Sequence, residues 1–225
     1  MIELDKVAFS HGGGELLSDI SMVVKPGSFH FLTGPSGAGK TTFLRLLYGD
    51  LIATAGQVRI AGKDTRTMTR DEVALVRRRI GFVPQNAVFL DHLPVAENVA
   101  LPLLVSGRDA ARAEADLSEL LTWVGLAGHR EAHPPELSGG ERQRVALARA
   151  VITSPDIILA DEPTGNVDWD MSQKILRLLV ELNRMGKTVM IATHDIALIR
   201  AAKSQVQSRV LRIASRRLQL AGADL

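Results

Sequence analysis

Short apolar runs dominate both ends of the chain, and a helical pattern occupies its middle. Runs of four or five mostly apolar residues, bounded by turn residues, are typical of buried strands. Residues 29–32, 157–160 and 188–192 have this form, and residues 171–185 carry helical spacing between the last two runs. Strands that alternate with helices in this way predict an α/β arrangement.

From about residue 87 to residue 153 the pattern becomes helical. Residues 109–124 carry a stripe of apolar residues at helical spacing that closes at Gly125, and its members are Leu117, Leu120, Leu121 and Val124. No internal repeat is visible. We therefore predict one domain over residues 1–225, in which residues 1–86 and 154–225 form a core and the helical segment is inserted between them.

A glycine-rich loop follows the first predicted buried strand. It matches the pattern G-x-x-x-x-G-K-[ST], and apolar residues on both sides supply the strand–loop–helix context that this pattern requires. The glycines let backbone N–H groups surround phosphate oxygens, Lys40 adds a mobile cation, and Thr41 is placed to give its hydroxyl to Mg²⁺. We expect a nucleoside triphosphate to bind at Gly34, Pro35, Ser36, Gly37, Ala38, Gly39, Lys40, Thr41 and Thr42.

Two adjacent carboxylates follow the apolar run at 157–160. They emerge at the carboxyl end of a predicted strand, which is the edge at which open α/β sheets bind ligands. Neighbouring strand residues point to opposite faces, so Asp161 and Glu162 cannot share one task. We expect Asp161 to join the Mg²⁺ shell, directly or through water, and Glu162 to polarise the water that attacks the γ-phosphate.

A third motif, Leu-Ser-Gly-Gly-Glu, lies upstream of the carboxylates. Ser138 is placed to cap a helix, while Gly139 and Gly140 leave N–H groups of its first turn uncovered, which creates a second anion site. Alone, such a string is more often an ordinary helix start. Its position between the two phosphate motifs, with Glu141 at its end, favours a functional interpretation.

The three motifs together resemble those of the ATP-binding-cassette (ABC) ATPases, and the resemblance covers nearly the whole chain. It implies an α/β fold with a RecA-like P-loop NTPase core, an antiparallel β subdomain and an inserted α-helical subdomain. It also implies ATP and Mg²⁺ as cofactors, and an ATP-dependent homodimer whose two copies stack head to tail. In that arrangement the nucleotide of one copy is contacted by the other copy through Ser138, Gly139, Gly140 and Glu141.

Further positions match this family in order and local context. The resemblance implies that Gln85 reaches the Mg²⁺ and the attacking water, and that His194 is a switch residue at the γ-phosphate. It places Asn166 and Asp168 in the loop that crosses to the second copy. The catalytic set implied is thus Glu162, His194 and Gln85, with Thr41, Gln85 and Asp161 at the metal.

One position departs from the family pattern. Where the family usually stacks a tyrosine on adenine, this chain has His11, with Phe9 two residues earlier on the same strand face. An imidazole ring offers less stacking area than a phenol ring. We expect His11 to contact the base with looser selectivity, and the alternative is that it is only a turn residue.

Composition limits the partners and the location. A net charge of +2 and an aromatic content of 4% argue against nucleic acid as a direct partner. The chain has no cysteine, which fits a reducing compartment. Its start lacks the features of a signal peptide, and no apolar run approaches the ~20 residues that span a bilayer. We expect a cytoplasmic protein that is peripheral to the inner membrane.

Details of the motifs narrow the family. The glutamate that ends Leu-Ser-Gly-Gly-Glu and the sequence Asp-Glu-Pro-Thr-Gly-Asn resemble cassettes that transmit conformational work to a membrane protein, and cell-division cassettes resemble the chain most. This implies an integral membrane partner and a part in controlling peptidoglycan hydrolysis. The ATPase of a lipoprotein-release or macrolide-type exporter is the nearer alternative. A soluble ABC ATPase acting on nucleic acid or ribosomes is a more distant one.

An apolar stretch directly after Gln85 is the candidate seat for the partner. Its apolar side chains either pack the helical lobe onto the core or receive a short amphipathic helix. Packing is favoured for Val88 and Leu93, and we expect Phe89 and Leu90 to face the partner.

Overall fold

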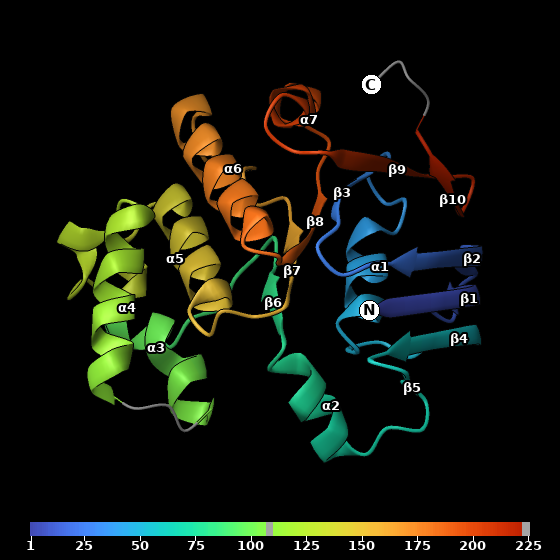
Figure 1. Ribbon diagram of the computed structural model, residues 1–225, viewed down its shortest axis with the longest axis horizontal. Coiled ribbons are helices and arrows are strands. Elements are labelled where there is room, and N and C mark those ends of the chain that lie inside the picture. The colour runs from blue at the N-terminus through green and yellow to red at the C-terminus, as the bar shows by residue number, and fades with distance from the viewer. Residues whose placement is uncertain (107–109, 222–225) are drawn as a thin grey trace.

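A six-stranded sheet forms the centre of the computed structural model, which describes residues 1–106 and 110–221 (Figure 1). Five of its strands run parallel, and the sixth pairs antiparallel at one edge. In spatial order they are β10 (Arg217–Leu220), β9 (Ser208–Ala214), β3 (Phe29–Thr33), β8 (Thr188–Ala192), β7 (Ile157–Asp161) and β6 (Ile80–Val83). The three strands predicted from apolar runs are confirmed.

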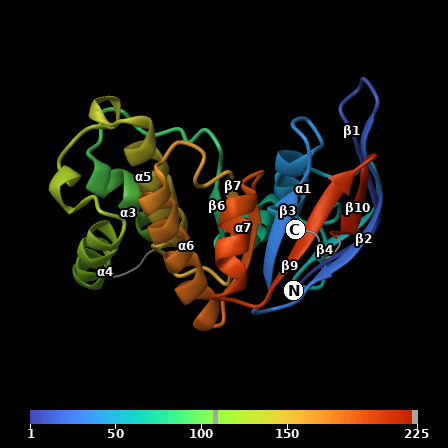
Figure 2. The same ribbon diagram turned by 90° about the horizontal axis from the view of Figure 1, so that it is seen from above.

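A separate four-stranded antiparallel sheet lies beside the first (Figure 2). Its order is β2 (Glu15–Val24), β1 (Ile2–Ser10), β4 (Ala55–Ile60) and β5 (Lys63–Asp64). Helix α1 (Lys40–Leu47) packs between the two sheets, because Phe43 and Leu47 share one apolar cluster with residues of both. The expected antiparallel β part of the fold is therefore present.

Helices cover the face of the six-stranded sheet that is opposite to α1. Three of them gather at the end of the molecule away from the four-stranded sheet (Figures 1 and 2): α3 (Val95–Ser106), α4 (Ala110–Trp123) and α5 (Gly139–Val151). The remaining helices are α2 (Arg70–Arg77), α6 (Trp169–Arg184) and α7 (Ile196–Lys203), with short 3₁₀ turns at Ala127–His129 and Pro134–Glu136. Within the described ranges, no helix is long and apolar enough to cross a lipid bilayer.

Two apolar clusters occupy opposite faces of the six-stranded sheet. On β7, Ile158 and Ala160 belong to the cluster that contains the helices, whereas Ile157 and Leu159 belong to the cluster around α1. This alternation follows from the two-residue period of a strand. The cluster with the helices runs without a break from α3 and α4 to α6 and α7, so the boundaries proposed near residues 87 and 153 stay predictions.

Candidate active site

The glycine-rich loop connects β3 to α1 at the carboxyl edge of the six-stranded sheet. Gly34 has a φ of 150°, and a Cβ at this position would lie 2.7 Å from the carbonyl oxygen of Ile213. Gly39 precedes α1 with a φ of 98°, and in the described part of the chain no side chain caps this helix. First-turn N–H groups without a side-chain acceptor are the arrangement that binds phosphate.

Lys40 folds back over the loop. Its Nζ donates hydrogen bonds to the carbonyl oxygens of Gly34 at 2.9 Å and Pro35 at 3.2 Å. Both acceptors are neutral, and a charged phosphate oxygen is a stronger acceptor for an ammonium group. The side chain is therefore poised to exchange these bonds for bonds to an anion.

Thr41 in the first turn of α1 meets Asp161 at the end of β7. The Thr41 hydroxyl donates to Oδ2 of Asp161 at 2.6 Å. Asp161 is only 1% exposed, and burial raises the pKa of its carboxyl, an effect that the Thr41 hydrogen bond partly offsets. The carboxylate thus lies in a place where a cation would stabilise its charged form.

Glu162 follows Asp161 directly after the end of β7. Its φ of 48° is left-handed, and its N–H donates to the carbonyl oxygen of Ala192 at 2.8 Å. Oε1 of Glu162 lies 2.9 Å from Nδ1 of His194, whose side chain is 76% exposed. The two neighbouring carboxylates therefore have different partners, although Glu162 lies beyond the end of β7 and does not follow the alternation of a strand.

A cavity of about 520 Å³ joins these groups. Gln85, exposed in the segment after β6, borders the cavity although its own strand lies at the far edge of the sheet. Leu16 of β2 also borders it, and sequence reasoning missed this residue because a leucine inside a strand carries no motif. The lining comprises Leu16, Gly34, Pro35, Ser36, Gly37, Gly39, Lys40, Thr41, Thr42, Gln85, Asp161, Glu162 and His194.

His11 lies in the loop between β1 and β2, and it is not part of the described lining of this cavity. Its exposed ring meets Phe9 edge-on, with ring centroids 4.6 Å apart and an interplanar angle of 84°. Phe9 itself is 6% exposed, so it anchors the imidazole without reaching the surface. Contact of His11 with a base stays a prediction.

Ser138 and Glu141 close the start of α5 with a capping box. Ser138 Oγ accepts from the Glu141 N–H at 3.3 Å, and Glu141 Oε2 accepts from the Ser138 N–H at 2.8 Å. Hydrogen bonds from Ser138 hold the pKa of the Glu141 carboxyl below its usual range. Within the described residues, positions 138–141 do not border the cavity around Lys40.

The two glycines of this motif differ in the space around them. A Cβ at Gly140 would lie 2.9 Å from the carbonyl oxygen of Asn166, whereas a Cβ at Gly139 would meet only Cβ of Asn166, at 3.9 Å. The loop that contains Asn166 ends at Asp168, whose side chain caps α6 by accepting from the Met171 N–H at 2.8 Å. The structure thus brings the predicted signature residues and the predicted crossing loop together.

The segment after Gln85 corrects one expectation. Phe89 is 6% exposed and lies between two guanidinium groups of α5, that of Arg142 at 5.2 Å and that of Arg149 at 4.7 Å from the ring centroid. Arg149 also donates to the carbonyl oxygen of Val88 at 2.8 Å. The expectation that Phe89 faces a partner is therefore wrong, because Phe89 packs this segment onto α5.

Other apolar residues of the segment do reach the surface. Val88 is 80% exposed and Leu90 is 42% exposed, while Leu93 is half-buried. The packing favoured for Val88 is wrong as well, since its backbone is held but its side chain is free of the core. The fully buried Asn98 fixes the loop by exchanging hydrogen bonds with the backbone of Leu90 at 2.9 and 3.0 Å.

The donor set at the cavity fits a magnesium ion. Mg²⁺ takes oxygen ligands and keeps several waters, so it needs only one or two protein groups besides substrate phosphates. Thr41 and Asp161 place a hydroxyl and a carboxylate side by side, and Gln85 brings an amide to the same cavity. These hard oxygen donors are those that Mg²⁺ prefers.

Comparison with solved structures identifies the class of protein. A dimeric structure of MJ0796, described as a bacterial ABC transporter cassette, matches with a TM-score of 0.89 and 35% identity over 97% of each chain. The ATP-binding cassette MJ0796 in a dimeric post-hydrolysis state, bound to ADP and Pi, matches with a TM-score of 0.88 and 33% identity over 99% of this chain and 100% of that one. The fold is that of an ABC-type ATPase.

Sequence relatives agree with the fold. The cell division ATP-binding protein FtsE of Bacillus subtilis (strain 168) is 41% identical over 207 residues, which cover 92% of this chain and 91% of that protein. The protein of the same name from Escherichia coli (strain K12) is 43% identical over 200 residues, which cover 88% and 90%. The family model described as ABC transporter matches residues 17–165. The chain belongs to the ABC transporter family and is an ATP-binding ATPase.

Proposed function

We propose that this chain is the ATPase subunit of a membrane-associated complex that acts in cell division. The observation that carries the proposal is the identity of 41% and 43% to two FtsE proteins over roughly nine-tenths of each chain. In this proposal the chain lies on the cytoplasmic face of the inner membrane and works with an FtsX-like membrane protein to control peptidoglycan hydrolysis.

The phosphate loop binds ATP by exchanging hydrogen bonds. Lys40 gives up the carbonyl oxygens of Gly34 and Pro35 and donates to phosphate oxygens instead, while the first-turn N–H groups of α1 donate from below. Thr41, Asp161 and Gln85 are the residues that would hold Mg²⁺. When bound, the ion neutralises charge on the phosphates. Burial of Asp161 favours this role, because a nearby cation removes the cost of its buried negative charge.

Glu162 is the proposed general base. Glu162 is paired with His194 and Asp161 with Thr41, so the base and the metal ligand have separate partners. His194 contacts Oε1 of Glu162 at 2.9 Å and leaves Oε2 for the attacking water. The exposed imidazole of His194 is free to follow the γ-phosphate. Glu162 then orients the water and takes its proton.

A second copy of the chain completes the site in this proposal. Ser138, Gly139 and Gly140 lie outside the cavity of their own chain, which supports a role at the nucleotide of a partner copy. The neighbouring loop with Asn166 and Asp168 would cross the same interface, since Asn166 packs against Gly140. The dimeric state of MJ0796 in both solved structures supports this arrangement.

A groove between the core and the helices is the proposed seat of the membrane partner. Its volume is about 730 Å³, and among the described residues its lining contains three arginines and no acidic side chain. Arg77, Arg78 and Arg149 are these arginines, and Val105 of α3 lines the groove with 69% of its side chain exposed. A short amphipathic helix that carries a carboxylate fits this combination of charge and apolar surface.

Co-purification tests the partner directly. The measurement is a pull-down of the tagged chain from membranes that contain the FtsX-like protein of the same genome. We expect Val105→Asp in the groove, and Leu90→Asp in the adjoining segment that Arg149 holds, to lose the partner while they keep their melting temperature and ATP affinity. Leu220→Asp on β10, which is 73% exposed and far from the groove, is the matched control. Retained binding in both variants would refute the seat. Recovery of a lipoprotein-release or drug-export permease would show that the chain serves export and not cell division.

A further inference from the structure

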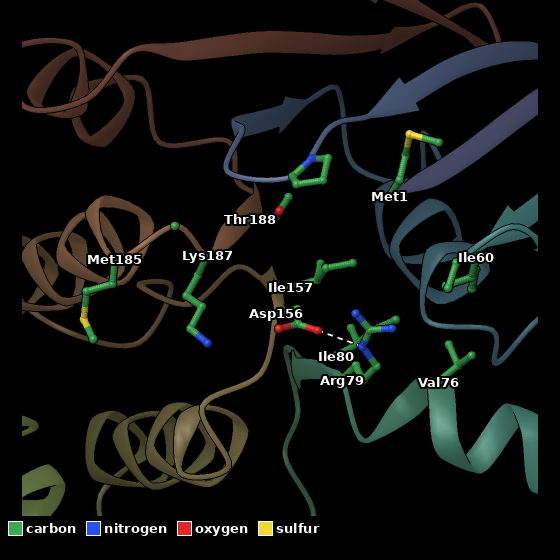
Figure 3. Close-up of a pocket in the computed structure, with 13 residues that line it drawn as sticks. Met1, Ile60, Val76, Arg79, Ile80, Asp156, Ile157, Met185, Lys187 and Thr188 are labelled. Atoms are coloured by element: carbon green, nitrogen blue, oxygen red, sulfur yellow. Dashed lines mark hydrogen bonds and ion pairs between the residues drawn. The ribbon is translucent and has the colours of Figure 1, made fainter.

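A second cavity lies at the opposite edge of the six-stranded sheet from the nucleotide site. It holds about 370 Å³, which is within the range of sites for small molecules. We call it the edge pocket and define it by Ile60, Val76, Arg79, Asp156, Ile157 and Lys187, which Figure 3 shows around it. None of these residues takes part in the ATP chemistry described above.

The floor of the edge pocket is aliphatic. Ile60, Ile80 and Ile157 present side chains that are 3%, 4% and 8% exposed, and Val76 of α2 adds a half-buried wall. These residues come from both sheets and from α2, so the pocket is built where three parts of the fold meet. A rigid floor of this kind accepts an apolar body and excludes water from it.

Charged groups stand along one wall. Nε of Arg79 donates to Oδ2 of Asp156 at 2.7 Å, and Nζ of Lys187 donates to the carbonyl oxygen of Ser154 at 2.9 Å. Figure 3 shows Asp156 between Lys187 and Arg79, with Ile60 and Val76 beyond the guanidinium group. The pocket thus holds two cations and one acid, and Asp156 engages Arg79 only through Nε. Among the described residues, the terminal amino groups of Arg79 make no hydrogen bond, which leaves them for a ligand.

This combination selects the chemical class of the ligand. A guanidinium group matches a carboxylate through two parallel hydrogen bonds, and the extra positive charge of Lys187 favours an anion over a cation. The aliphatic floor favours a saturated body over a sugar or a nucleotide. We propose that the edge pocket is a regulatory site for a small carboxylate with an apolar body.

The position of the pocket gives it access to the ATPase. Ile80 begins β6, Ile157 begins β7 and Thr188 begins β8, and all three residues line the pocket. At about 3.3 Å per residue, these strands end roughly 13 Å away. There they deliver the segment with Gln85, the carboxylates Asp161 and Glu162, and the segment with His194. A ligand in the pocket therefore contacts the first residue of every strand that positions these four side chains.

Binding of octanoate, measured by isothermal titration calorimetry, tests the site. Octylamine and octanol, which have a positive charge and no charge on a similar chain, are the controls. We expect saturable binding of octanoate alone, in a ratio of one per chain. Arg79→Gln should weaken it about tenfold or more, because a hydrogen bond to a charged group is lost, whereas Arg200→Gln on the exposed face of α7 should not. Equal binding of octylamine, or unchanged affinity in Arg79→Gln, would overturn the proposal.

A steric variant separates this pocket from other sites. Val76→Phe fills the pocket from α2 without changing its charge, and Leu75→Phe places the same ring on a neighbouring position that is 58% exposed. We expect Val76→Phe to abolish octanoate binding and Leu75→Phe to keep it, with melting temperatures recorded for both. Saturating octanoate should change the ATPase rate of the wild type and of Leu75→Phe but not that of Val76→Phe. Binding that leaves the ATPase rate unchanged would refute the regulatory role, whatever membrane partner the chain has.

Discussion

Helices α1 and α5 both have glycine at their start, and they differ in what occupies their N-termini. In the described residues α1 has no side-chain cap and opens into the cavity that Asp161 and Glu162 border. Helix α5 is capped by Ser138, and its own Glu141 accepts the Ser138 N–H. A helix start binds an anion only as far as its own sequence leaves N–H groups free. We therefore expect α1 to bind phosphate within one chain, and α5 to contribute only when a second copy brings a nucleotide to it.

The largest expected effect concerns the chemistry beside α1. Glu162→Gln keeps the size of the side chain and removes the proposed base, so turnover should fall by at least ~10²-fold while ATP binding survives. The measurement is steady-state phosphate release together with nucleotide titration. Gel filtration with ATP should reveal an accumulated dimer. A rate above about half of the wild-type rate would remove Glu162 from catalysis.

The second prediction separates the two helix starts. Lys40→Ala should lose ATP binding, because the loop loses its mobile cation. Gly139→Val should keep ATP binding in the monomer and lose ATPase activity, since a Cβ at this position is sterically free within its own chain. Gly140→Val is the matched control, expected to lower the melting temperature because its Cβ would collide with the carbonyl of Asn166. Equal loss of ATP affinity in Lys40→Ala and Gly139→Val would contradict the division between α1 and α5.

Two carboxylates should change the stability with opposite signs as pH rises: Asp161, which accepts from Thr41 of α1, and Glu141 in the capping box of α5. Asp161 has a raised pKa, so the folded state keeps its proton better than the unfolded state. The stabilisation from protonated Asp161 is therefore fully present below 3.8, the ordinary pKa of an aspartate, and is lost as pH rises. Asp161→Asn without nucleotide should therefore raise the melting temperature at pH 7.5 and change it little near pH 3.5. A lower melting temperature at pH 7.5 would show that burial does not govern this group.

The smallest expected effect is at the cap of α5. Glu141 has a lowered pKa, so its charged form stabilises the folded state. This stabilisation is present above 4.5, the ordinary pKa of a glutamate, and is lost as pH falls. Glu141→Gln should destabilise the protein at pH 7.5 and not in acid. Ser138→Ala removes the cap and should cost ~1 kcal/mol, which is about 2–4 °C in melting temperature for a chain of this size. Calorimetric melts at both pH values check these signs, and a pH-independent loss in Glu141→Gln would contradict them.

Much of the fold and of the nucleotide cavity was predictable from the sequence. Buried parallel strands have continuous apolar runs, and the phosphate loop has a fixed spacing, so the elements that carry Lys40 and Asp161 are readable without coordinates. The cap by Ser138 was predictable because Ser138 and Glu141 have the spacing of a capping box. Each of these signals is local, because neighbouring residues alone determine the geometry.

Features that depend on distant packing were not readable. Phe89 looks like a surface residue in its own segment and becomes a core residue only because two arginines from α5 enclose it. The exposure of Val88 follows from the same packing. The left-handed backbone of Glu162 also has no signal in the sequence. It accompanies a hydrogen bond from the Glu162 N–H to Ala192 on the neighbouring strand, which is a distant contact.

The enclosure of Phe89 gives α5 a mechanical role. Arg149 near the end of this helix contacts the ring of Phe89 and donates to the carbonyl oxygen of Val88, so the segment is fixed to the helix there. Helix α5 has 13 residues and is about 20 Å long, with Ser138 at its other end. We therefore expect a displacement applied at Val88 to be transmitted along α5 to the motif proposed to face the second copy. Helix α5 thus connects the proposed seat of the partner, near Arg149, with the proposed dimer interface, near Ser138.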